Sequence, residues 1–501
     1  MSSFPVVKAE SVSLLAALES TLGVQPTSGW QTLEPNADGI SEFYPKLTKV
    51  SPSPLTKLRQ KNASAIVDLS ASPKLTLDLT KDHTDRFIEG AMLAKAKHSG
   101  GTGLAYFTPT ARTTTDYTVA ASGALQAGTL MLARGFVNAA NNGLFQVGAS
   151  STATAIKVSG GVAETVSGYV ATLEVAGFRG ASGDIQIDVN GDIISTVADF
   201  TTMGLTVGQW LWVGGTIGGG HDFATAAYRG FAKIKGPITA TKIPLARRAW
   251  TVGSADTGTG KTIDLYWGRW LRTVAFTDAD YQEPTYNIEL SYLKLSAGTT
   301  DEYVYAAGNL IDEMQVTSPA QNLVTMDLSF VGTTIGDPTV TRATGASTAA
   351  ASLAIARYNT VNQQPYLRLV KQSDETTVSD DIETWSMTLK NNVTPQKQQG
   401  TLGTKRDVVG KAEVDLTASV FLTQDDALKA CSNNTALSFG AGFSNDDGGI
   451  FFDLPSVNCD NSPPKFPANG PVSLNLQLSA FRDATGNYTI GVSLFPYLPS
   501  A

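Results

Sequence analysis

The sequence predicts a mainly β protein: a sandwich or barrel with short helices at its edges, and a second all-β module inserted into the chain. Three observations lead to this prediction. The 501 residues include 47 glycines, and Thr, Ser, Ala and Val are abundant, which is typical of short strands joined by tight turns. Many stretches alternate apolar and polar residues. The chain is also too long for one compact core, and its composition changes between residues 99 and 250.

The clearest strand signal lies in residues 74–80, where Leu75, Leu77 and Leu79 alternate with polar residues and share one face. The next segment, residues 84–97, has apolar residues at helical spacing and Thr84 as a candidate N-cap. We therefore expect one strand to lead directly into one helix.

The same strand-helix plan recurs near the end of the chain. Residues 413–422 alternate as a strand, and a short helix is expected over residues 423–433, where Thr423 and Asp426 have a spacing like that of a capping box. Further alternating strands are expected at residues 322–331, 383–389, 472–480 and 489–495. These strands are enough for a sandwich or barrel.

An internal repeat lies between residues 99 and 250. Residues 143–158 align without a gap to residues 230–245, and residues 128–132 resemble residues 208–212. Self-similarity of this kind indicates two small related units. We therefore divide the chain into a discontinuous core, residues 1–98 and 251–501, and an inserted all-β module, residues 99–250. The repeat leads us to expect that the insert has an independent hydrophobic core and decorates the outside of the protein.

Some residues of the insert have expected structural roles. Trp210, Trp212 and Phe231 are expected in a hydrophobic core rather than on a ligand platform. Asn190 and Gly191 are expected to form a type I′ hairpin turn.

Long loops interrupt the predicted core domain. Residues 391–411 are too long for a hairpin turn and carry several charges, and residues 50–63 occupy the equivalent place before the first strand-helix copy. Residues 336–366 are expected to form another extended, polar loop. Long loops held by a rigid scaffold usually serve function or assembly, so we expect residues 391–411 to mediate assembly.

Charge and cysteine content exclude several classes of protein. The net charge of -8 disfavours a surface that binds phosphates, although it suits a protein that DNA must pass without sticking.

Cys431 and Cys459 are too few for a disulfide framework and are expected as free thiols, although their pairing stays open. The N-terminal residues lack the features of a secretion signal, so synthesis and assembly in the cytoplasm are expected. Residues 200–220 are too often interrupted by polar residues and glycines to span a membrane.

Candidate motifs for chemistry each have a structural explanation. Residues 255–262 resemble a phosphate-binding loop, but the β-branched and aromatic residues that follow predict a strand instead of the required helix. His83, His98 and His221 lie far apart in sequence. The Asp446 to Gly449 turn with Asp453 lacks the spacing of a calcium loop. We therefore predict no catalytic, cofactor-binding or metal-binding residues, and a protein that is not an enzyme.

Several short segments occur in a particular order along the chain. They are residues 23–26 (GVQP) after LLAALESTL, residues 305–314 (YAAGNLIDEM), residues 323–325 and 329–332, residues 391–395 and 400–403, and residues 452–455 (FDLP). In this order they resemble the major tail tube proteins of siphophages, the long-tailed bacteriophages. In that family a strand ends at the first segment, where the local pattern of this sequence also allows a helix. The insert lies outside these matches.

The resemblance implies a structural virion protein of the phage tail, without cofactors and with no membrane association. Its tail-tube-type β-sandwich would join six-fold into hexameric rings with a continuous inner barrel, which removes exposed strand edges. Loops and terminal arms would stack the rings into a tube. The lumen would hold the tape measure protein and later pass DNA without binding it specifically. Tail terminator and distal tail proteins would be further partners.

Two more expectations concern particular side chains. If DNA passes through the lumen, acidic residues on the predicted strands, such as Asp78, Glu383 and Asp415, are expected to line it. The alternative function is a glycan-binding module of a phage or bacterial surface protein. That module would recognise sugars through aromatic side chains, namely Trp210, Trp212, Trp267 and Trp270.

Overall fold

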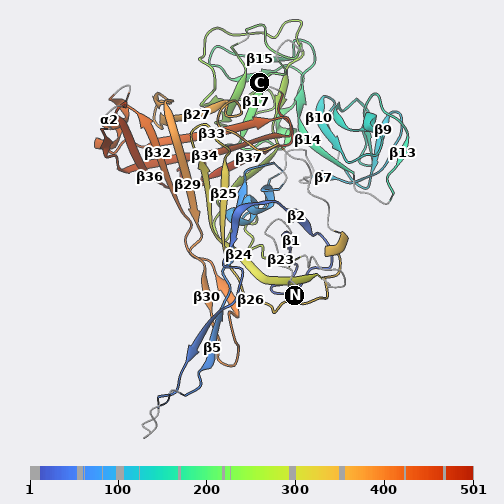
Figure 1. Cartoon of the computed structure of the whole chain (residues 1–501). Helices are drawn as coiled ribbons and strands as arrows, with labels where there is room; N and C mark the ends of the chain where they lie inside the picture. Colours follow the sequence, from blue (N-terminus) through green and yellow to red (C-terminus); the bar gives the residue numbers. More distant parts are fainter. Residues whose placement is uncertain are drawn as a thin grey trace.

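The fold is mainly β, as predicted, in the computed structural model of the chain (Figure 1). The structure describes residues 12–53, 60, 62–81, 83–97, 106–122, 125–167, 171–216, 220–225, 227–292, 301–348, 356–422, 425–466 and 470–499. His98 and Thr423 lie outside these residues. The strands form several antiparallel sheets, and in the described residues there are two α-helices, α1 (Asp85–Met92) and α2 (Asp426–Ser432).

The largest sheet system belongs to the core domain. Its strands are β1 (Val12–Leu18), β2 (Gln31–Leu33), β3 (Pro35–Ser41), β6 (Lys74–Asp78), β22 (Arg269–Arg272), β23 (Tyr286–Tyr292), β24 (Glu302–Ser318), β25 (Thr325–Val331), β26 (Thr334–Ile335), β27 (Tyr366–Lys371), β28 (Thr377–Ser379), β29 (Ile382–Lys390), β32 (Glu413–Phe421), β33 (Leu437–Asn445), β34 (Gly448–Asn461), β35 (Pro464–Lys465), β36 (Ser473–Ala480) and β37 (Gly491–Phe495). All six strands predicted from alternation are present, with ends shifted by a few residues. The LLAALESTL segment begins in strand β1, as the family resemblance implied.

Both predicted helices exist, and each follows its predicted strand. Helix α1 is shorter than expected, because Leu93 adopts a left-handed conformation and Ala94 and Lys97 then pair with other segments as bridges. Thr84 is the N-cap, but its hydroxyl donates to the carbonyl oxygen of Thr80 instead of capping the helix. Helix α2 begins after Asp425, again without a side-chain cap.

The insert forms a second antiparallel sheet with two smaller sheets beside it. Its strands are β7 (Tyr106–Phe107), β8 (Pro109–Arg112), β9 (Asp116–Val119), β10 (Thr129–Arg134), β11 (Gly143–Gln146), β12 (Ala155–Lys157), β13 (Glu164–Thr165), β14 (Thr172–Arg179), β15 (Ile185–Ile187), β16 (Ile193–Ser195), β17 (Trp210–Val213), β18 (Gly230–Ile234), β19 (Lys242–Ile243), β20 (Leu245–Ala246) and β21 (Asp264–Tyr266). The main sheet has the order β11-β10-β14-β21-β17-β18-β20. Because β21 lies between β14 and β17, the sheet extends past Trp250, where the sequence placed the end of the insert.

The internal repeat is confirmed by backbone geometry. The hairpin of β10 and β11 corresponds to the hairpin of β17 and β18. The Gly128 amide donates to the Val147 carbonyl across 2.8 Å, and the equivalent Gly208 amide donates to Ile234 across 2.8 Å. Gly128 and Gly208 have φ values of 98° and 92°, a region that favours glycine. The two units therefore share one local fold.

The insert has hydrophobic clusters of its own and is also joined to the core domain. Each repeat unit has a hydrophobic cluster of its own, but a third cluster joins the insert to the core domain. Its buried members are Leu130, Trp210, Trp212, Phe231 and Tyr266 from the insert side and Tyr366, Phe451, Phe495 and Leu498 from the core side. Trp210 stacks on Phe451 with ring centroids 3.8 Å apart. The insert is thus packed onto the core sheet.

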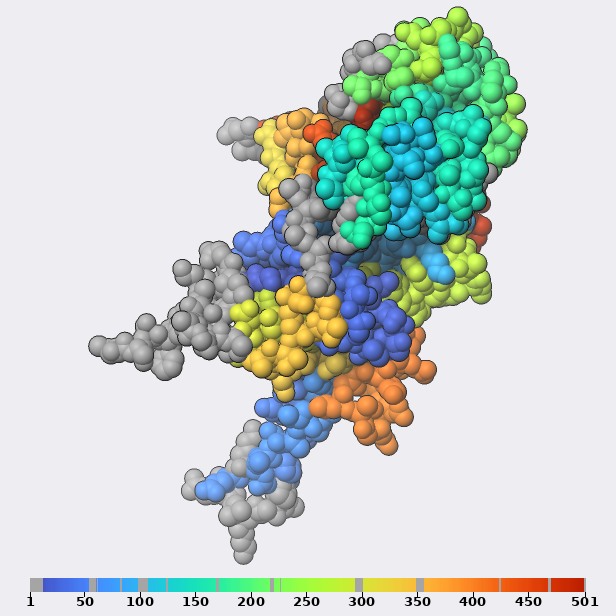
Figure 2. All heavy atoms as spheres, turned by 90° about the vertical axis from the view of Figure 1, so that its right-hand side faces the viewer, coloured from blue at the N-terminus to red at the C-terminus, as the bar shows by residue number. Residues whose placement is uncertain are grey.

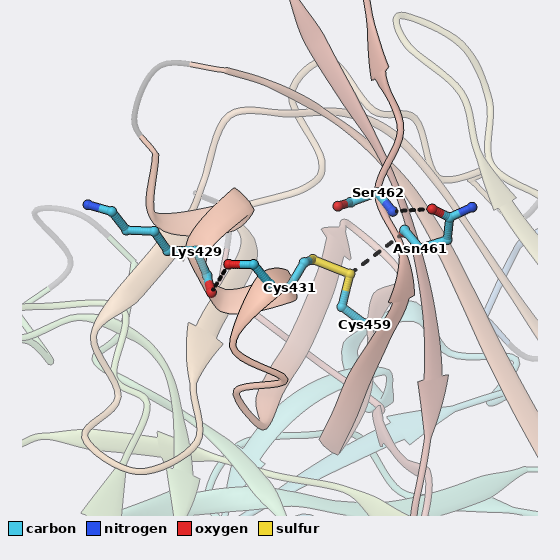
Figure 3. The surroundings of a disulfide bond; sticks show 6 residues. Lys429, Cys431, Cys459, Asn461 and Ser462 are labelled. Carbon is cyan, nitrogen blue, oxygen red and sulfur yellow. Dashed lines mark hydrogen bonds between the residues drawn. A yellow bond between two sulfur atoms is a disulfide. The ribbon is translucent and has the colours of Figure 1, made fainter.

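Two smaller expectations also need correction. Cys431 and Cys459, expected as free thiols, form a disulfide between α2 and β34 (Figure 3). Residues 188–192 do connect β15 and β16 as a hairpin, but only Gly191 has a positive φ, whereas a type I′ turn requires one at Asn190 too. The Gly191 amide donates to the Asp188 carbonyl, as in a longer loop built around a type I turn.

Candidate functional site: a polar sheet face and a projecting arm

Six neighbouring core strands present one continuous polar face. Their order is β6-β25-β24-β29-β32-β36, and every pairing is antiparallel. Successive side chains of a strand point to opposite sides, and the inward side chains of these strands are buried in the main hydrophobic cluster. The polar outward side chains form what we call the polar face: Lys74, Thr76, Asp78, Glu313, Gln315, Thr317, Thr325, Asp327, Ser329, Thr384, Ser386, Thr388, Lys390, Glu413, Asp415, Thr417, Ser419, Ser473, Asn475, Gln477 and Ser479. Phe421, at the end of β32, is an apolar residue on the same side.

Strand register places the side chains of the polar face in rows across the six strands. One row consists of Thr76, Asp327, Gln315, Thr388, Asp415 and Ser479, and the next of Asp78, Thr325, Thr317, Ser386, Thr417 and Gln477. Neighbours within and between rows bond to one another. The Gln315 amide donates to the Ser386 hydroxyl across 2.9 Å, and the Thr76 hydroxyl donates to Asp327. The polar face is therefore an ordered surface of small polar and acidic groups.

Acidic groups outnumber basic ones on the polar face. The carboxylates are Asp78, Glu313, Asp327, Glu413 and Asp415, and the ammonium groups are Lys74 and Lys390. Lys390 lies 3.8 Å from Glu313, which neutralises part of this charge. Asp78 is paired with Arg357 across 2.7 Å. Two of the three acidic residues singled out in the sequence, Asp78 and Asp415, thus lie on the polar face.

Glu383, the third acidic residue, lies where the register between β29 and β32 shifts. It accepts a hydrogen bond from Ser419, so its carboxylate is at the margin of the polar face. Glu313, Asp327 and Glu413 also belong to this face, although the sequence did not single them out. Alternation predicted the strands of Asp327 and Glu413, but the register that brings the three residues together depends on a bulge that the pattern does not reveal.

A two-stranded arm projects from the body of the protein. It consists of β4 (Lys46–Val50) and β5 (Ala65–Ser70), and it extends away from the sheets in Figures 1 and 2. Leu47, Val50, Ile66 and Val67 are 42–54% exposed on it. An isolated two-stranded hairpin is marginally stable in water, and clustered exposed apolar side chains mark interaction sites. The arm is therefore suited to contact another surface.

Of the two loops that the sequence singled out, residues 391–411 lie beside β5 at the base of the arm, whereas residues 50–63 fall between β4 and β5, with residues 54–59 and 61 outside the described part of the chain. Residues 391–411 contain a small hairpin of β30 (Thr394–Gln396) and β31 (Arg406–Val408). Lys397 of this segment forms an ion pair with Asp68 of β5, and Gly403 packs near Leu69. Asn391 fixes the start of the segment by donating to the carbonyl oxygens of Ala91 and Ile311. In residues 336–366, the described parts form an extended loop with one short 3₁₀ turn, η4 (Ala346–Thr348), as expected.

Buried charges fasten the insert to the core domain beside the shared aromatic cluster. The Lys233 ammonium in β18 donates to the Asp453 carboxylate in β34 across 2.6 Å, and the Tyr488 hydroxyl donates to the same carboxylate across 2.7 Å. Arg247 lies 3.3 Å from Asp453. Burial lowers the pKa of Lys233 to about 8, since the attraction of Asp453 does not offset desolvation and the repulsion of Arg247. In a buried ion pair, the attraction offsets the cost of desolvation only when the distance and orientation of the charged groups are right.

A second buried charge group connects the insert and the core through β22. Arg269 forms ion pairs with Asp85 at the start of α1 and, across 3.5 Å, with Glu174 of β14. All three side chains are buried. The insert is therefore held to the core at two separate places by buried ion pairs.

A cavity of about 430 Å³ lies at the junction of insert and core. Both parts line it, with Lys233 and Arg247 from the insert and Gln372, Asp483 and Tyr488 from the core. These polar groups already bond to neighbours: Gln372 donates to Asp483, and Arg247 and Tyr488 contact Asp453. The cavity is a gap between two packed modules whose polar walls are largely satisfied.

The tryptophans of the alternative function are unavailable to a ligand. Trp210, Trp212, Trp267 and Trp270 are 0–4% exposed, so none can serve as a platform for sugars. Trp210, Trp212 and Phe231 are core residues, as expected, although their cluster belongs to the junction and not to the insert alone.

The remaining sequence motifs have structural roles where the structure describes them. Residues 255–262 lead into strand β21 and not into a helix. Asp446 and Asp447 form the turn between β33 and β34, while Asp453 points to Lys233. The His221 ring forms a hydrogen bond with the Thr262 hydroxyl. In the described part of the chain, no three His, Cys, Asp or Glu residues come together as metal ligands, and no helix has the length and apolar character needed to cross a membrane.

Comparison with known families agrees with this architecture. The model of a family described as "Phage tail tube protein" matches residues 179–480, which is more than half of the chain. The match begins at Arg179, inside the predicted insert, and covers the second repeat unit, part of the junction and five of the six strands of the polar face. No curated protein matches the chain closely enough to count as a relative. The chain therefore belongs to the phage tail tube protein family, and it is a structural component of the virion tail.

Proposed function

We propose that six copies of this protein form a ring whose inner wall is the polar face, and that stacked rings form the conduit through which DNA leaves the virion. The continuous polar face carries this proposal. A sheet with one buried apolar side and one ordered polar side suits the wall of a wide, water-filled channel, because the polar side needs no protein covering. Closing six sheets into one barrel would also satisfy the strand edges of each subunit.

The charge of the polar face supports passage of DNA without binding. Its five carboxylates and two ammonium groups give a net negative surface at neutral pH. Proteins bind DNA phosphates mainly through clustered Lys and Arg side chains, because these side chains displace counterions from the DNA. The polar face carries few such cations. The tape measure protein would occupy the same lumen before DNA does. Tail terminator and distal tail proteins would close the two ends.

The arm and residues 391–411 would join each ring to the next. The arm extends beyond the sheets (Figure 2) and carries exposed apolar side chains that a neighbouring ring can bury. The ion pair of Lys397 with Asp68 and the contact of Gly403 with Leu69 connect the two segments. Assembly is expected in the host cytoplasm. The alternative function, glycan recognition, is not supported, because the tryptophans on which it depended are buried.

Negative-stain microscopy of the purified full-length chain tests this proposal. Six-fold rings or tubes with a central channel are the expected result. A density map of the tube would then show whether Asp415 and Gln477 line the channel. A protein that stays monomeric at high concentration, or a tube lined by another face, would contradict the proposal.

A further inference from the structure

Cys431 and Cys459 occupy two elements that are otherwise loosely connected. Cys431 lies near the end of helix α2 and Cys459 lies on strand β34, 28 residues later, and their Cα atoms are 5.1 Å apart (Figure 3). This separation is in the usual range for a disulfide. Both side chains are only partly buried at the edge of the main hydrophobic cluster, so the sulfur atoms can be reached by small oxidants and reductants.

Apart from the disulfide, helix α2 has weak attachments. It has seven residues, no side-chain cap, and only Ala427 and Ala430 as buried residues. A helix of this length is not stable alone. Its ion pair of Lys429 with Asp425 is mostly exposed, and Lys371 lies 3.8 Å from Asp426. The bond to β34 is therefore the strongest attachment of α2 to the sheet.

We propose that this disulfide is open while the subunit folds and assembles, and closes only after the tail has left the cell, as a late covalent staple of α2 onto the tube wall. The proposal rests on the proposed assembly in the host cytoplasm, where thiol systems keep cysteines reduced. The main hydrophobic cluster that holds β34 is built mostly from side chains outside α2. The fold therefore does not need the bond in order to form.

The closing step is a two-electron oxidation. Each thiol loses its proton, one sulfur–sulfur bond forms, and the two electrons and two protons pass to dissolved dioxygen, which becomes hydrogen peroxide. The reaction begins when a thiolate is available. Both cysteines are partly exposed, which permits this oxidation in an assembly whose neighbouring subunits leave the two sulfur atoms uncovered.

Counting thiols at two stages tests the timing. The full chain is expressed in the cytoplasm, and the cells are treated with N-ethylmaleimide before lysis, so that free thiols are blocked at once. After unfolding, intact mass should show two modified cysteines per chain. The same protein, purified and kept in air before labelling, should show none. A disulfide already present in the quenched cells, or two free thiols after exposure to air, would overturn the proposal.

Variants separate the staple from the fold. The double variant Cys431→Ser/Cys459→Ser should fold and assemble as the wild type does. Dithiothreitol should lower the unfolding temperature of the aerated wild type to that of the double variant, and leave the double variant unchanged. Ser432→Ala, a neighbouring change in the same helix, should keep the response to dithiothreitol. A double variant that cannot fold would show that the bond is needed early. If no protein forms tubes, the ring proposal fails, while the thiol counts still decide the timing.

Discussion

The ammonium group of Lys233 and the carboxylate of Asp453 meet across 2.6 Å at the junction of insert and core, and both side chains are buried. Their residues are 220 positions apart in the chain. This contact, with the stack of Trp210 on Phe451, makes the insert a part of the folded body.

Asp453→Ala should destabilise the protein strongly. The variant leaves Lys233 and Arg247 buried without their shared carboxylate, and removal of one partner of a buried ion pair costs about 3–5 kcal/mol. Denaturant unfolding of the subunit under conditions that prevent assembly measures the change. Asp415→Ala, on the polar face, is the control and should change the free energy of unfolding by less than about 0.5 kcal/mol. Equal effects of the two changes would mean that the junction contributes no more than a surface site.

The stability of the junction should depend on alkaline pH through Lys233. Its folded pKa of about 8 lies below the unfolded value of 10.5. Between these values the unfolded chain binds more protons than the folded one, so the contribution of Lys233 to stability rises with pH across this window. The free energy of unfolding of the wild type should therefore increase relative to that of Lys233→Met from pH 7.5 to pH 10, by at most about 3 kcal/mol. A constant difference between the two proteins would show that the pKa is not lowered.

Deletion of residues 99–250 with joined flanks should now prevent soluble folding. An insert that only decorates the outside of the protein, as expected from the sequence, would instead be dispensable for assembly. The structure shows that the deletion would expose Tyr366, Phe451 and Phe495 and would leave Asp453 without Lys233 and Arg247. Recovery in the soluble fraction and circular dichroism measure the outcome. Deletion variants that form tubes at normal yield would restore the view of the insert as a separable decoration.

The sequence predicted five of the six strands of the polar face because they alternate with one buried side, whereas β24 was indicated only by the family resemblance of residues 305–314. Leu75 and Leu77 alternate with Thr76, and Leu416 with Asp415 and Thr417, over whole strands. The rows across strands could not be predicted, because they depend on the register shift between Ile311 and Glu313.

The junction between insert and core was beyond sequence reasoning for a similar reason. Trp210 and Phe231 look like residues of any hydrophobic core, and nothing local shows which sheet they pack against. Lys233 occupies an ordinary position in a repeat whose first copy has Gln146 there, and Gln146 is exposed. The disulfide was missed because spacing in sequence does not reveal that α2 ends beside β34.

Shortening residues 397–405 to a tight turn should give a folded subunit that no longer forms tubes. The segment lies at the base of the arm and contributes one exposed ion pair, Lys397 with Asp68, which is worth less than about 1 kcal/mol to folding. Thermal unfolding should therefore change little, while electron microscopy should show no tubes. Lys397→Ala alone is the control and should still assemble. Tubes at normal yield from the shortened chain would remove the loop from the assembly contacts.

Reversal of charge on the polar face should make the tube retain DNA. Asp415 lies in a polar row, between Thr388 and Ser479, and its side chain is exposed. Asp415→Lys would place six ammonium groups in each proposed ring, and each phosphate contact adds affinity through counterion release, so retention should weaken steeply as salt rises. Asp415→Asn removes the charge without adding a cation and is the matched control. Val197→Lys adds a cation at an exposed position of the insert, which lies away from the polar face. Retention of short double-stranded DNA by sedimented tubes, measured from low to physiological salt, should occur with Asp415→Lys and with neither control. If Val197→Lys retains as much DNA, the outer surface binds it and the polar face is not the lumen; if Asp415→Lys retains none, phosphates do not reach this face.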